Sequence, residues 1–169
     1  DARISLTCQP WRVGSMTEKR KRRLPDRQQL RVWRDYIETA AAVRSRTASR
    51  LMSAAALSDG DYQVLLALTE AEGNRLRSSQ LADAIGWERS RLSHHLGRME
   101  KRGLISREEC AEDSRGAQVV LSSEGARAFR VGSRPHLEAV RELFVDALTE
   151  EQLEQLAGIS AALQRQLDD

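Results

Sequence analysis

A break in an apolar helical pattern, at Gly86, constrains the fold of this chain more than any other sequence feature. On both sides of it, apolar side chains recur at the three- and four-residue spacing of a helix: Leu81, Ile85, Leu92, Leu96 and Met99. Glycine suits a turn that needs a positive φ, because it has no Cβ. Ala82, Gly86 and Leu92 have the spacing of a helix-turn-helix, with a small residue where the helices cross. The sequence therefore predicts two short helices joined by a tight turn.

The second of these helices has a polar surface rich in arginine, serine and histidine. With its leucines and methionine facing inward, the outer and flanking faces fall to the remaining residues: Arg89, Ser90, Arg91, Ser93, His94, His95 and Arg98. Long basic side chains beside short hydroxyls suit phosphates and base edges in a DNA major groove. We predict DNA contacts for Arg89, Ser90, Arg91, Ser93, His94 and Arg98, with Arg89 as a candidate phosphate contact. The alternative is an ordinary solvated surface.

Two short extended runs follow this helix and predict a β-hairpin. Gly103 is placed to end the helix as a left-handed cap, and the runs are Leu104 to Cys110 and Ala117 to Leu121. The turn between them contains Asp113-Ser114-Arg115-Gly116, so the hairpin has a basic tip. Arg75-Leu76-Arg77 is expected to add a short strand that pairs with the hairpin. A helix-turn-helix followed by such a hairpin is a winged helix.

Over these residues the chain resembles the MarR family of transcriptional regulators. The resemblance is carried by SSQLADAIGWERSRLSHHLGRMEKRGLI from Ser78, by Asp113-x-Arg115, and by Leu121-Ser122-Ser123-Glu124-Gly125. It implies a homodimer that places one recognition helix per subunit into successive major grooves of a pseudo-palindrome, about one helical turn apart. It also implies that Arg115 contacts the minor groove and that Asp113 orients it. Repression is the commoner outcome in that family.

Helices are also predicted before the winged helix. The first begins at Pro25 or Asp26 and runs to about Ala55; it is alanine-rich and needs a partner for its apolar face. Ser58 and Asp61 form a capping box for the second helix. Its buried stripe is expected at Tyr62, Leu65, Leu66 and Thr69, with Gly73 at its end, and Ser78 or Ser79 is expected to cap the next helix.

Two more helices are predicted after the hairpin. Ser122 or Ser123 caps a long one that reaches about Leu148, and Pro135 is expected to kink or split it near Arg134. Thr149-Glu150-Glu151-Gln152 is a capping box for the last helix. Each of the helices outside the winged helix has one apolar face, and a chain of this size does not cover all of them internally. Two-fold pairing of two copies is the simplest solution.

The expected fold class is therefore mainly α, of the α+β winged-helix type, with N- and C-terminal dimerisation helices. We expect residues 1–23 as an N-terminal extension, 24–56 as a dimerisation helix, 57–121 as the winged helix-turn-helix DNA-binding domain, and 122–169 as C-terminal dimerisation helices. Residues 1–15 look like upstream residues or a cloning remnant, because Met16-Thr17 reads as a natural start. The basic run Lys19 to Arg23 is interpreted as a solvated tail, with a flexible arm on DNA phosphates as the alternative.

The distribution of charge and the cysteine content favour a nucleic-acid-binding protein of the cytoplasm. Basic residues dominate from Arg75 to Arg107 and acidic ones from Glu138 onward, as expected of a protein with one face for nucleic acid. Cys8 and Cys110 give no disulfide framework, which indicates the cytoplasm, and Cys110 is interpreted as an inert thiol. No apolar run approaches the roughly 18 residues of a membrane span. Abundant arginine and alanine with little lysine indicate a GC-rich bacterial source.

The sequence contains no pattern typical of a catalytic or metal site. His94 and His95 diverge by about 100° on a helix and do not share a metal ion. No nucleophile signature, phosphate loop or metal-ligand spacing is present, so we expect no cofactor, no metal and no enzymatic activity.

Many members of the resembled family bind a small aromatic ligand between the dimer helices and the winged helix. Aromatic residues that could line such a crevice here are Trp33, Tyr36, Tyr62 and Phe129, and the alternative is that they belong to the core. Two other classes of function remain open: a winged-helix protein-interaction module, and an architectural DNA binder without sequence preference. The basic recognition helix argues against the first, and its short polar side chains argue against the second.

Overall fold

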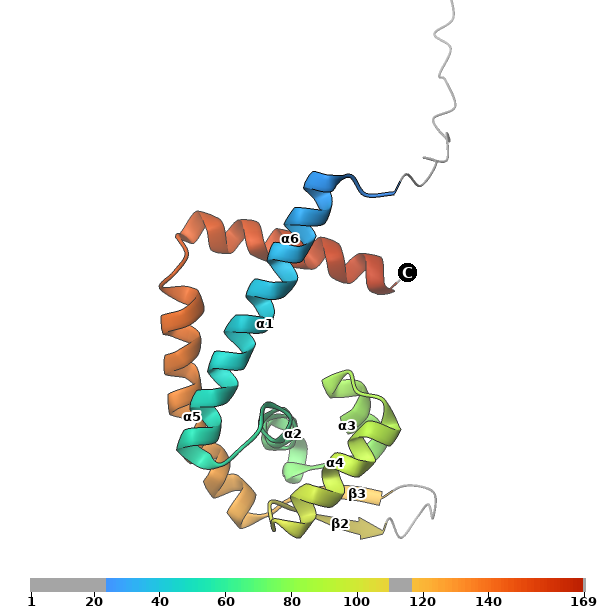
Figure 1. Cartoon of the computed structure of the whole chain (residues 1–169). Helices are drawn as coiled ribbons and strands as arrows, with labels where there is room; N and C mark the ends of the chain where they lie inside the picture. Colours follow the sequence, from blue (N-terminus) through green and yellow to red (C-terminus); the bar gives the residue numbers. More distant parts are fainter. Residues whose placement is uncertain (1–23, 110–116, 169) are drawn as a thin grey trace, which may run out of the picture. The chain divides into compact units, whose positions relative to one another are not determined.

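The computed structural model of the chain describes residues 24–109 and 117–168 (Figure 1). The chain is mostly helical with one small antiparallel sheet, which confirms the predicted fold class. Its elements are α1 (Arg27–Ala55), α2 (Asp59–Glu70), η1 (Glu72–Asn74), β1 (Arg75–Arg77), α3 (Ser78–Ile85), α4 (Arg89–Lys101), β2 (Ile105–Glu109), β3 (Ala117–Leu121), α5 (Ser123–Val140), η2 (Arg141–Val145) and α6 (Glu150–Asp168). The described residues 24–36 belong to one compact unit and residues 37–168 to another.

Asp26 begins α1, as predicted. Its Oδ1 accepts hydrogen bonds from the backbone N–H groups of Gln28 (2.8 Å) and Gln29 (2.9 Å), and Gln29 Oε1 accepts one from the Asp26 N–H. This reciprocal arrangement satisfies donors that the first turn of a helix otherwise leaves unpaired. Thr47 and Leu51 are the buried residues of α1, so most of this helix is exposed.

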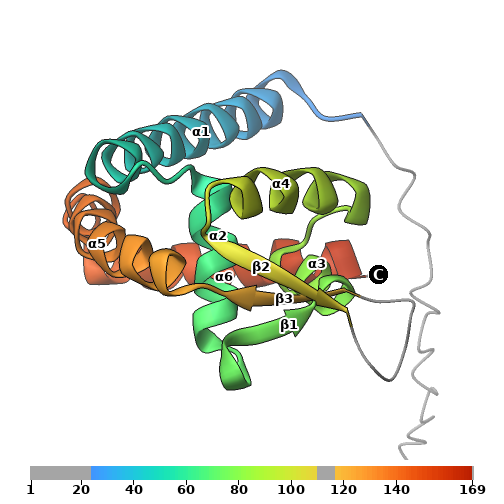
Figure 2. The same cartoon turned by 90° about the horizontal axis from the view of Figure 1, so that it is seen from below.

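Helix α2 lies at the centre of the second unit, in contact with α3, α5 and β3 (Figure 2). The predicted capping box is present: Asp61 N–H donates to Ser58 Oγ (3.1 Å), and Ser58 N–H donates to Asp61 Oδ2 (2.8 Å). The predicted stripe was partly wrong, because Leu66 is only partly buried and Thr69 is exposed. The buried side chains of α2 are Asp61, Tyr62, Val64, Leu65 and Leu68. A helix covered on several sides buries more than one stripe.

The sheet has the order β1-β3-β2, with Val119 of β3 opposite Leu76 on one side and Arg107 on the other. The predicted pairing of the short strand β1 with the hairpin is confirmed. The predicted serine cap of α3 was wrong: Arg77 is the N-cap residue, and the Ser78 hydroxyl instead donates to the Ala117 carbonyl (3.0 Å). This hydrogen bond to a backbone carbonyl of β3 fastens α3 to the sheet.

The helix-turn-helix of α3 and α4 forms as predicted. Gly86 has φ +65° and ψ +34°, in the left-handed region that glycine adopts without strain. Ile85 is only partly buried. The other side chains predicted to face inward are buried: Leu81, Ala82, Leu92, Leu96 and Met99. Gly103 follows α4 with φ +71°, which confirms it as the predicted left-handed cap. These contacts fix the orientation of α4 on α2 and α3.

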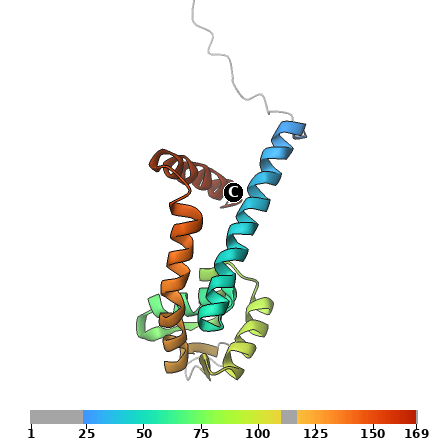
Figure 3. The ribbon, with the colours of Figure 1, turned by 60° about the vertical axis from the view of Figure 1, so that its left-hand side comes forward.

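The sequence predicted a kink or a split of α5 at Pro135, and of these two the split was wrong. The helix is continuous from Ser123 to Val140 with the proline inside it, and the irregular turn comes later, as the π-helical segment η2. One proline removes one backbone donor, and the packing of α5 outweighs that loss. Gly132 lies so close to the C-terminal part of α1 that an added Cβ would stand 2.8 Å from Leu51 Cδ1, and the α5 ribbon lies next to that part of α1 (Figure 3).

The predicted caps at the N-terminal ends of α5 and α6 are confirmed. Ser122 Oγ accepts a hydrogen bond from Gly125 N–H (2.9 Å) and donates one to the Gly103 carbonyl (2.6 Å). Gly125 lies directly against the backbone carbonyl of Leu104, where a Cβ has no room. Thr149 and Gln152 form the reciprocal box that opens α6. The described side chains of α6 are exposed or only partly buried.

Candidate nucleic-acid interface

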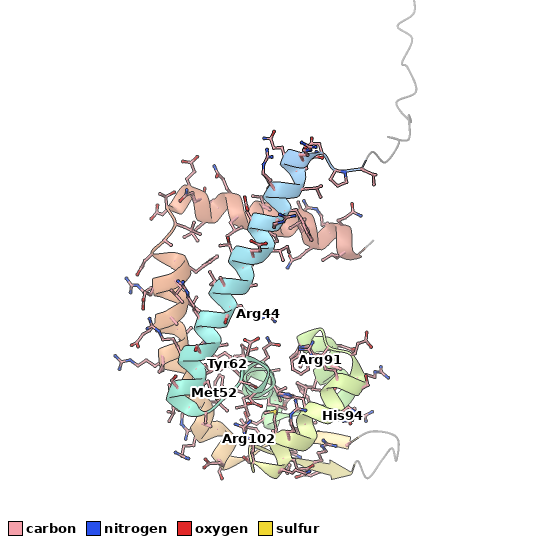
Figure 4. All side chains as sticks on the ribbon, in the orientation of Figure 1. Arg44, Met52, Tyr62, Arg91, His94 and Arg102 are labelled. Carbon is pink, nitrogen blue, oxygen red and sulfur yellow. The ribbon has the colours of Figure 1, made fainter. Side chains whose placement is uncertain are left out.

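Helix α4 presents its polar side chains on a surface that the other described residues leave open. All the residues of α4 that the sequence predicts as DNA contacts are exposed: Arg89, Ser90, Arg91, Ser93, His94 and Arg98. Figure 4 marks Arg91 and His94 on this helix. The apolar side of the same helix is buried in the core through Leu92, Leu96 and Met99. The helix is therefore firmly seated while its basic and hydroxyl side chains remain available to a partner.

Arg91 is stacked on the indole of Trp87. Its guanidinium carbon lies 4.0 Å from the centroid of the ring, which is a cation–π contact. Trp87 stands in the turn before α4, its backbone N–H donates to the Ala82 carbonyl (2.9 Å), and its ring meets His95 edge-on with centroids 5.2 Å apart. The contact between Trp87 and Arg91 is not among the sequence-based predictions.

His95 corrects the sequence-based assignment of α4, which placed it on the outer or flanking faces. The residue is buried, with 8% of its surface exposed. Nε2 lies 3.0 Å from Asp61 Oδ1 but is not in hydrogen-bond alignment, and Nδ1 lies 2.9 Å from Arg98 Nη2. An arginine side chain has donors only, so Nδ1 must act as the acceptor and the neutral ring carries its proton on Nε2. His95 thus connects a buried carboxylate with an exposed arginine.

Asp61 joins three parts of the chain at one buried carboxylate. It caps α2 with Ser58, it lies beside His95, and its Oδ2 accepts a hydrogen bond from Arg102 Nη1 (2.7 Å). Arg102 Nη2 also donates to the carbonyl of Ala56 (2.6 Å). Burial by itself raises the pKa of the Asp61 carboxyl, but the contacts with His95, Arg102 and Ser58 outweigh it and lower the pKa well below its ordinary value. The carboxylate is therefore ionised and holds the C-terminal end of α4 against α2.

Arg107 of β2 attaches the sheet to the recognition helix. Its Nη2 donates to the backbone carbonyl of Ser93 (3.1 Å), and its Nε lies 3.5 Å from Glu100 Oε2. Gly97 lies beneath the guanidinium, where an added Cβ would stand 3.5 Å from Arg107 Nη2, an ordinary contact. Gly97 therefore lies where the arginine of β2 reaches α4.

The predicted hairpin tip, with Asp113 and Arg115, lies outside the described residues, and so does Cys110. The aromatic residues proposed for a ligand site are divided between the two units. Tyr62 and Phe129 are in contact, with ring centroids 5.2 Å apart, whereas Trp33 and Tyr36 are exposed and belong to the other unit. An open crevice of about 700 Å³ lies elsewhere, between α2, the helix-turn-helix and Arg44 of α1.

Apolar side chains and polar or charged side chains both line this crevice. They are Arg44, Gln63, Leu66, Ala67, Glu70, Ala71, Leu76, Ala84, Ile85, Gly86, Trp87 and Arg91. Within residues 24–109 and 117–168, no group of three or more histidine, cysteine, aspartate and glutamate residues could hold a metal ion. Among those same residues, no helix has both the length and the apolar character to cross a membrane.

Comparisons with known proteins agree on one family. A sequence model of the MarR family matches residues 57–116. AbsC, a MarR family transcriptional regulator from Streptomyces coelicolor, is 33% identical over 86% of this chain and 98% of its own, with a TM-score of 0.80. Sco3205, a MarR family transcriptional regulator from the same organism solved in complex with DNA, is 35% identical over 86% of this chain and 91% of its own, with a TM-score of 0.81. The S. aureus MepR–DNA complex, 18% identical over 78% of this chain and 94% of its own (TM-score 0.71), shares the fold.

Proposed function

The chain belongs to the MarR family of transcriptional regulators, and from that membership we propose that it represses transcription by binding a pseudo-palindromic operator as a homodimer in the bacterial cytoplasm. The observation that carries the proposal is the outer face of α4, where exposed arginines and serines stand on a helix whose other face is buried. The DNA complex of Sco3205 supports it, since that relative is 35% identical.

We assign roles by side-chain chemistry. Arg91 and Arg98 are proposed to grip guanine edges, because a guanidinium can donate two parallel hydrogen bonds to the guanine O6 and N7 atoms. Ser90, Ser93 and His94 are proposed to contact base edges or phosphates, and Arg89 a phosphate. The proposed minor-groove contact of Arg115, oriented by Asp113, stays a prediction.

The proposed dimer accounts for apolar side chains that one copy leaves exposed. In residues 37–168 they lie on α1, α5, η2 and α6, outside the winged helix: Ile37, Met52, Val131, Leu137, Phe144, Val145, Ile159, Leu163 and Leu167. Large exposed apolar surfaces commonly mark sites of association. On this basis we propose that residues 24–56 and 122–169 form the dimer interface.

Relief of repression by a small ligand is the second part of the proposal. The crevice beside the helix-turn-helix combines apolar walls, such as Leu66 and Ile85, with the guanidinium groups of Arg44 and Arg91. That chemistry suits a small acid with an aromatic body. A ligand there would lie next to Arg91, a proposed DNA contact. Trp33, Tyr36, Tyr62 and Phe129 stay the candidates that the sequence gives for such a ligand.

The test is selection of bound duplexes from a random pool, followed by titration of the selected duplex and a scrambled one at two salt concentrations. We expect an enriched inverted repeat, bound about a thousandfold or more above scrambled DNA. Arg91→Ala should relax the preference at one position of each half-site. Arg130→Ala, which removes an exposed arginine from α5, is the matched control and should change little.

The other outcomes identify the rival functions. Salt-dependent binding without an enriched sequence would contradict the proposal and favour an architectural DNA binder. An absence of binding even at low salt would favour a protein-interaction module.

A further inference from the structure

We propose that Trp87 is a positioning residue for Arg91: it holds the guanidinium in the place from which Arg91 contacts DNA. This inference rests on the proposed function, because it concerns how one of the proposed contacts is prepared. The guanidinium carbon lies 4.0 Å from the indole centroid, and Arg91 as a residue remains exposed. A cation over an aromatic face is attracted by the ring quadrupole, so the contact restricts an otherwise flexible side chain.

The indole itself has little freedom to move. An added Cβ on Gly60 of α2 would stand 2.7 Å from its Cη2 atom and 3.2 Å from its Cζ2 atom, so the ring lies directly on the α2 backbone. The edge of the ring also meets His95, with an interplanar angle of 81°. His95 is buried next to Asp61, which Arg102 and Ser58 hold in turn. Arg91 is therefore stacked on a surface that the core of the domain fixes.

Arg89, another proposed DNA contact near the start of α4, has no such support from a neighbouring side chain. Within the part of the chain that the structure describes, the Arg89 side chain makes no hydrogen bond, ion pair or ring contact. The two arginines stand on the same turn of α4, two residues apart, and differ in this respect. Ordering a free arginine on DNA costs side-chain entropy, and a side chain held in place beforehand loses less of it. We thus expect Trp87 to raise affinity and selectivity through Arg91 and not through Arg89.

A double-mutant cycle on the full chain tests the inference, with the selected duplex and single-base variants of it as probes. We expect Trp87→Leu to weaken binding roughly two- to fivefold per half-site and to relax the same base position as Arg91→Ala. In an Arg91→Ala background the effect of Trp87→Leu should nearly vanish, whereas in an Arg89→Ala background it should persist. Trp87→Phe should restore part of the loss, because phenylalanine retains a ring face for the cation.

The outcomes separate this inference from the proposed function. Equal, additive losses in both backgrounds would overturn it, because they are what a purely structural tryptophan produces. A preference that Arg91→Ala leaves unchanged at every base position would also overturn it while leaving the proposed function in place. An absence of sequence preference in the unmodified protein would overturn both. Circular dichroism monitors folding, and Trp87→Phe carries the cycle if Trp87→Leu does not fold.

Discussion

Replacement of Asp61 by asparagine isolates the charge of the buried carboxylate. Asparagine keeps the volume and one acceptor oxygen, so the change removes the ionic character of the contacts with Arg102, His95 and Ser58. Hydrogen bonds to a charged group contribute about 1.5–3 kcal/mol, and breaking a fully buried pair costs about 3–5 kcal/mol. The Arg102 side chain is 42% exposed, so solvent screens its share. We therefore expect Asp61→Asn to lower the free energy of unfolding by about 2–3 kcal/mol.

The pH dependence gives the sharper test. The pKa of Asp61 in the folded chain lies below the unfolded value, which is near 3.9. The stability that the carboxylate provides is thus complete above about pH 5 and is lost as the pH falls below about 4. Urea unfolding of both proteins at equal protomer concentration, between pH 7 and pH 3, should show a difference that shrinks at the acid end.

Two results would refute this reasoning. One is a difference in unfolding free energy between the wild type and Asp61→Asn that stays constant down to pH 3. The destabilisation would then come from packing and not from charge. The other is a wild-type stability at neutral pH that the substitution leaves unchanged. Asp83→Asn, on the exposed side of α3, serves as the control for a general loss of negative charge.

Three further changes probe the fold and the assembly. Gly125→Ala should lower the free energy of unfolding, measured in urea, by more than Gly86→Ala does. An alanine Cβ at position 125 meets the Leu104 carbonyl, whereas one at position 86 has open space and costs only the strain of the positive φ, about 1–2 kcal/mol. Burial, which outweighs an opposing effect of Asp59, lowers the pKa of His136, so stability should fall as the pH drops below about 6.5, and His136→Phe should remove this dependence. Leu163→Glu, on exposed α6, should shift the sedimenting mass from dimer to monomer; an unchanged dimer would contradict our assignment of α6.

Features set by a few neighbouring residues could be predicted from the sequence. The left-handed turn at Gly86 and the capping boxes at Ser58 and Thr149 each depend on contacts within four residues, and all three are confirmed. The errors at Pro135 and Ser78 arose where tertiary contacts outweigh a local rule.

The position of His95 shows a different limit. It follows Leu92 by three residues and precedes Met99 by four, so its spacing already placed it on the buried face of α4. Its polarity argued for the surface instead, because the partner that permits its burial, Asp61, lies far away in the sequence. Local patterns identify which side of a helix is covered, but they do not pair a buried polar group with its distant partner. The contact of Trp87 with Gly60 of α2, which fixes the ring on which Arg91 stacks, was inaccessible for the same reason.

The contact of Arg107 with the backbone of α4 bears on how such a protein changes its target in evolution. Arg107 binds the carbonyl of Ser93, an atom that every amino acid at that position supplies. The outer side chains of α4 can therefore be exchanged for others while the strand continues to hold the helix in the same place. If the outer side chains read DNA as we propose, support and specificity reside in separate atoms of the same residues, and new DNA sequences become accessible by substitution without reconstruction of the domain.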